Sequence, residues 1–281
     1  MPKFFDAHTH LNFSDFDKDR DEIIKKTLLK DIWMVNVGSD KISSAGAVSI
    51  AQKYEAGVYA AVGIHPDSGE DYVQDFYKKL SQNPKVVAIG ECGLDYAFFV
   101  RKRRERQQKR ASAEAESEGG FSDADITIKK ERQKELFIRQ IKLAEEVGKP
   151  LMIHCREAFA DLIKILDSFF IIHHLGNPGI LHFFSGSLED AKRLLEMGFS
   201  FSFGGVITFT RDYDEVIKFI PMDKILLETD APFISPEPLR GKRNEPVNVE
   251  LVAQKIAEIK NLDLTEAAKQ TTENARKIFG I

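Results

Sequence analysis

Short runs of apolar residues recur along the chain, and most of them are separated by an amphipathic segment. The runs have the length of buried strands, while apolar positions three and four residues apart in the intervening segments predict helices. The runs end at His8, Val37, His65, Glu91, His154, His182, Gly204 and Asp230. Most successive ends lie about 22 to 29 residues apart, and a strand, a helix and two connections need about 30 residues. The pattern therefore predicts eight successive βα units.

Eight such units, with no strong hairpin signal between them, favour a closed parallel (β/α)8 barrel, the TIM barrel, over an open doubly wound sheet. The open alternative typically carries a glycine-rich fingerprint after its first strand, and this chain has none there. At 281 residues the chain has the size of one such barrel. We therefore expect one α/β barrel domain over 1–281.

The amphipathic segments predict the helices of an outer ring. We expect helices over 19–29, 133–147, 247–259 and 265–279, because each places its apolar side chains on one face. Ser187 is expected to cap a further helix, since a serine hydroxyl accepts a hydrogen bond from a backbone N–H group of the first turn.

The step from Glu91 to His154 is about twice as long as the others, which predicts an insertion over 97–130 after the fourth strand. The insertion opens with a basic run, 101–110, and continues through a small and acidic stretch, 111–120. Two interpretations remain open: a solvated or partly disordered excursion, or a basic flap that grips a polyanion. Its position favours a role at the site, because it leaves from the carboxyl end of a barrel strand.

Composition narrows the class of protein further. The formal net charge is -4, so the chain lacks the global positive field of a nucleic-acid coat protein, although a nuclease needs only local positive charge. Cys92 and Cys155 each follow a candidate ligand and are expected to be reduced packing residues. The chain opens directly on its first strand and has no apolar run of about 18 residues. We therefore expect no signal peptide, no membrane span and a cytoplasmic location. The sequence does not determine the oligomeric state, for which a monomer is the default expectation.

The polar residues at the predicted strand ends are mostly of the kinds that bind metals. They are His8, His10, His65, Glu91, His154, His182 and Asp230. The carboxyl ends of barrel strands meet at one rim, so side chains far apart in sequence are expected to converge there. Imidazole and carboxylate ligands suit divalent ions such as Zn, Mn or Mg.

We take six of these seven residues, all except His65, as metal ligands. Six ligands are more than the number that one four-coordinate catalytic ion binds. We assign His8, His10 and Asp230 to one ion and His154 and His182 to a second, with Glu91 bridging the two. Two ions that share a carboxylate lower the pKa of a bound water and supply hydroxide at neutral pH.

Charge then indicates the substrate. Two divalent ions, two carboxylates and a hydroxide leave a positive centre, which suits a phosphate oxyanion without excluding a carbonyl. Arg156 follows His154 by two positions and is expected to point toward the same mouth. The segment 185–187 opens a helix whose N–H groups can bind an anion, and the loop 240–245 adds three cations beside the eighth strand.

Seven motifs carry a resemblance to a known family. They lie at 5–12, 63–66, 89–96, 153–156, 182–186, 227–232 and 240–246. Together they resemble the TatD-type metal-dependent deoxyribonucleases of the amidohydrolase superfamily. The resemblance implies a (β/α)8 barrel and metal-dependent hydrolysis of phosphodiester bonds in DNA, often as a 3′-to-5′ exonuclease on single strands. Whether RNA is also a substrate stays open at this point.

The resemblance also implies roles for individual residues. The metal residues are the six named above; Glu91 and Asp230 are the catalytic pair, and Asp230 also takes part in proton transfer. By the same resemblance, His65, Arg156 and Arg243 contact the substrate phosphate. The insertion has no counterpart that the resemblance covers.

Two alternatives to a deoxyribonuclease remain open. The first is a metal-dependent amide or ester hydrolase, such as a D-aminoacyl-tRNA deacylase. Many amide-hydrolysing relatives bridge their metals with a carbamylated lysine on the fourth strand, whereas here Lys85 lies at the wrong end of that strand and Glu91 takes the bridging place. The second alternative is a catalytically weak binding scaffold that uses the basic insertion.

Overall fold

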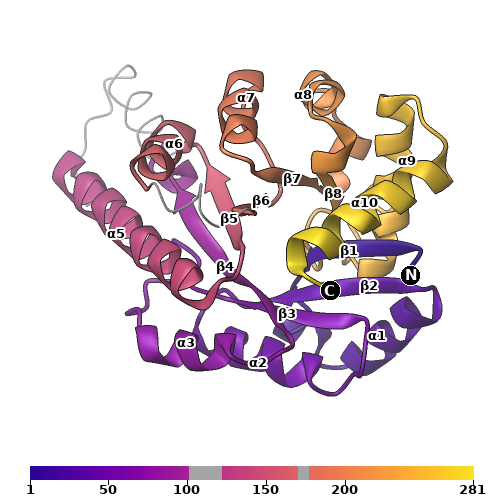
Figure 1. Ribbon diagram of the computed structural model, residues 1–281, viewed down its shortest axis with the longest axis horizontal. Helices are drawn as coiled ribbons and strands as arrows, with labels where there is room; N and C mark the ends of the chain where they lie inside the picture. The colour runs from indigo at the N-terminus through magenta and orange to yellow at the C-terminus, as the bar shows by residue number, and fades with distance from the viewer. Residues whose placement is uncertain (101–121, 170–176) are drawn as a thin grey trace, which may run out of the picture.

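The computed structural model describes residues 1–100, 122–169 and 177–281, and it confirms the predicted barrel (Figure 1). The strands are β1 (Phe4–Thr9), β2 (Ile32–Val37), β3 (Val58–Val62), β4 (Val86–Asp95), β5 (Leu151–Arg156), β6 (Gly179–Leu181), β7 (Ser200–Phe203) and β8 (Ile225–Leu227). They form one sheet in sequence order, and every neighbouring pair is parallel. The apolar runs therefore end at one rim of the sheet, as the spacing predicts.

The first and last strands meet at their carboxyl ends. A single parallel bridge joins Thr9 to Ala231. The His10 N–H group donates to the Ala231 carbonyl at 2.7 Å, and the Asp230 N–H group donates to the His8 carbonyl at 2.9 Å. These contacts close the barrel at the rim where the candidate ligands lie.

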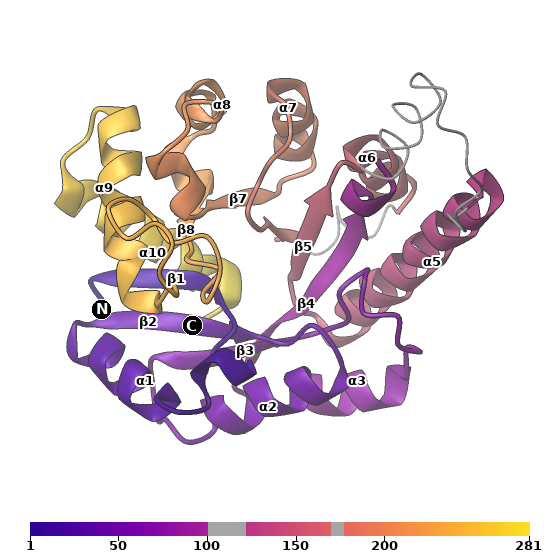
Figure 2. The ribbon, with the colours of Figure 1, turned by 180° about the vertical axis from the view of Figure 1, so that it is seen from behind.

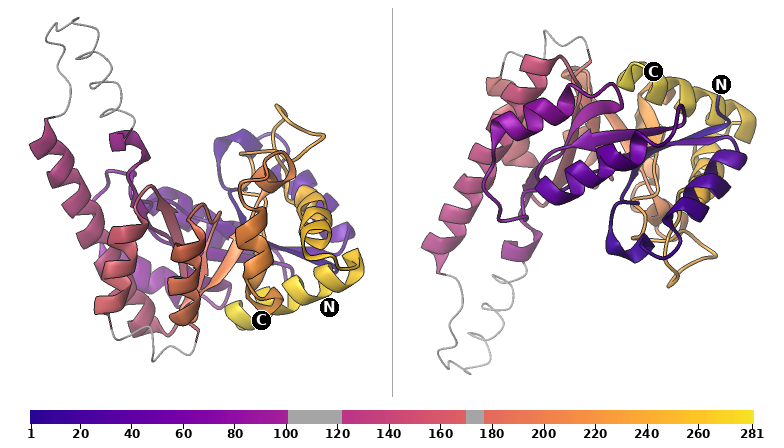
Figure 3. Two further views of the ribbon diagram at one scale, coloured as in Figure 1. Left: turned by 90° about the horizontal axis from the view of Figure 1, so that it is seen from above. Right: turned by 90° about the horizontal axis from the view of Figure 1, so that it is seen from below.

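Helices surround the strands (Figures 2 and 3). They are α1 (Arg20–Leu29), α2 (Lys41–Ala51), α3 (Gln74–Ser81), α5 (Asp123–Val147), α6 (Phe159–Ser168), α7 (Leu188–Glu196), α8 (Asp214–Phe219), α9 (Val249–Lys260) and α10 (Leu264–Phe279). Helices α1 to α3 lie in a row along β2 and β3, while α9 and α10 lie beside β1 and β8. Among the described helices, none has the combined length and apolar character needed to cross a membrane.

The apolar side chains form two clusters. The larger one packs the outward-facing side chains of the strands against the helices. The smaller one fills the interior of the barrel, where Phe5 stacks on Phe279 of α10 with ring centroids 5.8 Å apart. Cys92 and Cys155 are buried and free, as expected. Because α10 covers the amino-terminal end of the barrel, the carboxyl end is the one left open to a substrate.

Helix α5 begins ten residues earlier than the apolar pattern predicts. Ser122 caps it: its hydroxyl accepts from the Asp125 N–H group at 3.1 Å, and the Asp125 carboxylate accepts from the Ser122 N–H group at 2.8 Å. Residues 123–130, which the spacing assigned to the insertion, are therefore the first turns of α5. These turns are mostly exposed and polar, so only their capping pattern marks them in the sequence. The basic run 101–110 and the stretch 111–120 lie outside the described residues.

We expect Gly179→Ala to destabilise the protein by about 3 kcal/mol or more. Gly179 has a φ of 123°, and a Cβ atom there would lie 1.9 Å from the Leu151 carbonyl oxygen of the neighbouring strand. Gly148→Ala is the matched control, because its φ of 65° is also positive but nothing lies within 4 Å of its Cβ position, so about 1 kcal/mol is expected. Urea unfolding followed by circular dichroism measures both, and equal losses would contradict the proposed clash.

Candidate metal centre

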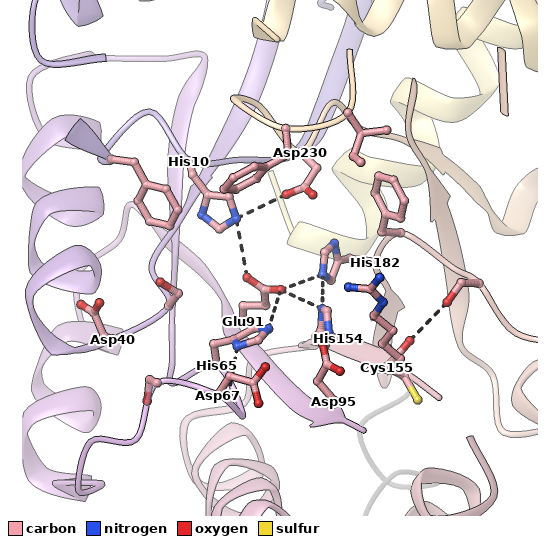
Figure 4. Close-up of a pocket in the computed structure, with 18 of the residues that line it drawn as sticks. His10, Asp40, His65, Asp67, Glu91, Asp95, His154, Cys155, His182 and Asp230 are labelled. Atoms are coloured by element: carbon pink, nitrogen blue, oxygen red, sulfur yellow. Dashed lines mark hydrogen bonds and ion pairs between the residues drawn. The ribbon is translucent and has the colours of Figure 1, made fainter. Parts of the chain in front are cut away.

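All six predicted ligands converge at the open end of the barrel, and Figure 4 shows all of them except His8. His10, Glu91, His154, His182 and Asp230 line a cavity of about 790 Å³ there. His8 is fully buried and lies against His182, with the ring centroids 3.8 Å apart. His8, Glu91 and His154 lie in β1, β4 and β5. His10 and His182 directly follow β1 and β6, and Asp230 lies three residues past the end of β8, so the rim of the barrel sets the positions of all six.

The first cluster consists of His8, His10 and Asp230. The Nε2 atoms of the two histidines lie 3.0 Å apart, and the Asp230 Oδ1 atom lies 3.7 Å from the first and 3.4 Å from the second. The Nδ1 atom of His10 lies 2.9 Å from the Val37 carbonyl and donates its proton to it, which leaves Nε2 with a lone pair. The cluster therefore presents nitrogen and oxygen donors to one point, as a divalent cation requires.

The second cluster consists of His154 and His182. Nδ1 of His154 lies 3.2 Å from Nε2 of His182, and both nitrogens face Oε1 of Glu91, at 3.1 Å and 2.9 Å. On the other side of the ring, Nε2 of His154 lies 3.1 Å from Oδ2 of Asp95. Asp95 thereby holds the His154 proton on Nε2, so that Nδ1 is the nitrogen free to bind a metal.

Glu91 lies between the two clusters. Its Oε2 atom faces the first cluster, 3.7 Å from Nε2 of His8 and 3.6 Å from Nε2 of His10. Its Oε1 atom faces the second cluster, as described above. Each carboxylate oxygen is therefore directed at a different pair of imidazoles.

The residues around the cavity are strongly acidic. The carboxylates that line it are those of Asp40, Asp67, Glu70, Glu91, Asp95 and Asp230. Among the described residues that line it, Arg156 is the one arginine or lysine. Such a cavity attracts cations and, without them, repels phosphate. The charge balance therefore agrees with the metal-binding character of the ligands.

Burial and neighbouring charges shift the pKa values in the cluster. Burial favours the neutral form of Glu91, but the imidazoles of His182 and His65 outweigh it and hold the pKa of Glu91 well below its usual range. Burial also lowers the pKa of His10, but the carboxylates of Asp230 and Glu91 outweigh it and raise that pKa. The pKa of His8 is lowered well below its usual value by burial and by His182. His8 is therefore neutral and ready to coordinate a metal at physiological pH.

Of the three residues expected at the substrate phosphate, two line the cavity and one does not. His65 and Arg156 line the cavity, and so does Ser185. Arg243 does not: its guanidinium donates to both carboxylate oxygens of Asp19, at 3.0 Å and 2.6 Å, and covers the Phe16 ring. Its charge is already paired in a contact that joins the loop after β8 to the start of α1. The structure therefore places Arg243 outside the lining of the cavity, and its contact with the substrate stays a prediction.

Sequence reasoning missed three buried carboxylates beside the ligands. Asp95 contacts His154, and Glu228 lies 3.7 Å from Nδ1 of His182 while accepting a hydrogen bond from Ser202 at 2.6 Å. Asp6 accepts hydrogen bonds from the Thr229 N–H and hydroxyl groups at 2.9 Å and 2.6 Å. Each carboxylate lies two or four residues from a ligand on the same strand or strand end, and this spacing is the signal that could have found it.

A (β/α)8 barrel whose carboxyl end gathers imidazoles and carboxylates in this way has the architecture of a metal-dependent enzyme. The family described as TatD related DNase matches residues 5–280, and the chain belongs to that family. Among similar proteins, YabD of Bacillus subtilis, described as an uncharacterized metal-dependent hydrolase, is 40% identical, with 99% of each chain covered.

Further relatives extend the comparison. A 3′-5′ ssDNA/RNA exonuclease TatD of Erwinia amylovora is 31% identical, over 99% of this chain and 100% of that protein. The crystal structure of YJJV, a TatD homolog from Escherichia coli, superposes with a TM-score of 0.81 at 27% identity, covering 99% of this chain and 98% of that one.

We expect Glu91→Gln to weaken metal binding by at least about 10- to 100-fold, because the amide cannot offer a negatively charged oxygen to each cluster. Asp40→Asn is the matched control, since it also converts a carboxylate at the cavity to an amide but keeps an N-cap residue for α2. Calorimetric titration of metal-stripped protein with Zn²⁺ and Mn²⁺ measures the affinities. Unchanged binding in Glu91→Gln would contradict the assignment.

Metal affinity should fall as the pH falls from about 8 to about 6, because an imidazole must lose its proton to bind a metal. The pKa values of His10, His154 and His182 are raised, since nearby carboxylates outweigh burial, so protons compete with the metal in this range. The pKa of His65 is lowered to about 4, mainly by burial, so His65→Gln should leave the pH dependence unchanged. Calorimetry in buffers of different ionisation enthalpy should show protons released on binding. An affinity independent of pH would contradict this prediction.

Proposed function

We propose that this protein is a nuclease that hydrolyses phosphodiester bonds of single-stranded DNA or RNA from the 3′ end with the help of two divalent ions. The observation that carries the proposal is the position of Glu91, whose two carboxylate oxygens face two separate pairs of imidazoles. The name of the Erwinia relative, a 3′-5′ ssDNA/RNA exonuclease, supports the choice of substrate.

The ligands divide between the two ions as their contacts do. His8, His10 and Asp230 would hold one ion, His154 and His182 the other, and Glu91 would bridge them. A donor set this rich in imidazole favours Zn over Mg. Bound ions of this kind lower the pKa of water and offset negative charge on a phosphate.

The protein's own groups would orient the substrate and accept the proton. Nδ1 of His65 accepts a hydrogen bond from the Asp67 N–H group at 3.1 Å, so its proton lies on Nε2 and can be donated to a phosphate oxygen. Arg156 supplies a positive charge at the mouth of the cavity. Asp230 lies at the solvent side of the first cluster, where its carboxylate can accept a proton from the attacking water.

Cleavage of 3′- and 5′-end-labelled single-stranded DNA by metal-stripped protein, with Mg²⁺, Mn²⁺ and Zn²⁺ added separately, tests the proposal. We expect products that shorten from the 3′ end with at least one ion and no cleavage without metal. Glu91→Gln should lower kcat by about 100-fold or more, and Asp40→Asn should retain activity. Absence of cleavage with every ion would refute the nuclease and favour the ester alternative, for which aminoacyl-tRNA is the next substrate.

A further inference from the structure

Two opposite kinds of surface border the cavity. One side carries the carboxylates of Asp40, Asp67 and Glu70, and Figure 4 shows Asp40 and Asp67 on the side of His65. The apolar residues of the cavity on the β1, β7 and β8 segments are Phe13, Val206, Tyr213, Phe233 and Ile234, which we call the apolar rim. Phe233 and Ile234 are 48% and 42% exposed and follow Asp230 closely in the chain. The apolar rim thus begins at a predicted metal ligand and continues into solvent.

The exposed part of the apolar rim is held in place by the buried side chain of Asn244. Its Nδ2 group donates to the carbonyls of Thr229 at 2.8 Å and Phe233 at 2.9 Å, and its backbone N–H group donates to the Pro232 carbonyl at 3.0 Å. Asn244 itself has no exposed surface. A loop fixed through its carbonyls by a buried amide presents Phe233 and Ile234 in a defined position, so little conformational freedom remains to be lost on binding.

The conformation of the same loop is unfavourable for its sequence. Ile234 has a φ of 45°, a region that β-branched residues rarely adopt, and its side chain is exposed. Neither feature stabilises the folded protein on its own. Backbone strain combined with an exposed apolar side chain at the edge of a site is typical of contact with a ligand.

Aromatic rings continue from the metal ligands to the apolar rim. The Phe13 ring stacks on the His10 ring at 4.4 Å and 14°, and the Phe233 ring meets Phe13 edge-on at 6.3 Å. Outside the lining of the cavity, in the segments that follow β7 and β8, the guanidinium of Arg240 lies 3.5 Å from the centre of the Phe209 ring. Proteins commonly bind unpaired bases with aromatic side chains and a nearby arginine. The rings stack on the flat faces of the bases, and the arginine pairs with the phosphates between them.

We propose that the apolar rim binds unpaired nucleobases next to the scissile phosphate by stacking, with Phe233 as its main contact. This inference rests on the proposed nuclease function and adds the path of the strand. Phosphates are repelled by the side that carries Asp40, Asp67 and Glu70, so the strand leaves the cavity across the apolar rim. Bases in a duplex are already stacked and paired, so this contact selects single strands.

The test compares Phe233→Ala with Phe219→Ala on two substrates. The substrates are a single-stranded oligothymidylate and the same oligonucleotide with abasic residues on either side of the scissile bond. Phe233→Ala should raise KM for the oligothymidylate by about 10-fold while kcat changes little, and most of this increase should disappear with the abasic substrate. Phe233→Trp should restore the affinity. Phe219 is a matched control, because it is a phenylalanine of similar exposure, 45%, at the end of α8 and away from the cavity.

Fluorescence anisotropy measures the affinity of the protein for the same two oligonucleotides, each labelled with fluorescein. It makes this comparison without relying on cleavage. Equal loss of affinity on both oligonucleotides, or no loss on either, would overturn the role of the apolar rim. If the wild-type protein binds these strands with the expected preference but cleaves neither, the proposed function is refuted. The role of the apolar rim in binding bases is then retained.

Discussion

The contact between β1 and β8 is the constraint on which the site depends. The fully buried Asp6 carboxylate accepts two hydrogen bonds from Thr229, and backbone bonds join Asp230 to His8 and His10 to Ala231. Without this closure, the two histidines that follow Asp6 and the aspartate that follows Thr229 would lie on opposite edges of an open sheet. The fold therefore builds one cluster of ligands from residues more than two hundred positions apart in the sequence.

The charge of the cavity would give a bound metal a second task besides activating water. The cavity is lined by six carboxylates and, among the residues that the structure describes, by one arginine. A phosphodiester would meet a repulsive field there in the absence of cations. Divalent ions would reverse the sign of the centre while leaving the outer carboxylates of Asp40, Asp67 and Glu70 negative. Metal binding and orientation of an anionic strand would then follow from the same distribution of charge.

Much of the fold and the position of the candidate ligands could be predicted because both follow from one periodic pattern. Apolar strand runs that end in polar residues predict where parallel strands finish, and a barrel brings those ends together. Contacts made by individual side chains do not follow from the pattern. The pairing of Arg243 with Asp19 depends on how two loops meet, and the contact of Asp95 with His154 depends on the register of β4 and β5. The early start of α5 was missed because its first turns lack an apolar face.

The interior of the barrel is completed by residues distant in the sequence, and this sets an order for its assembly on the ribosome. Phe5 emerges among the first residues, but its stacking partner Phe279 and the β8 segment, whose Ala231 bridges to Thr9 at the second edge of β1, are synthesised after most of the barrel. During that interval β1 offers an unpaired strand edge, and the apolar interior lacks its cover. The nascent chain is therefore expected to need chaperones that shield these surfaces until α10 has left the exit tunnel.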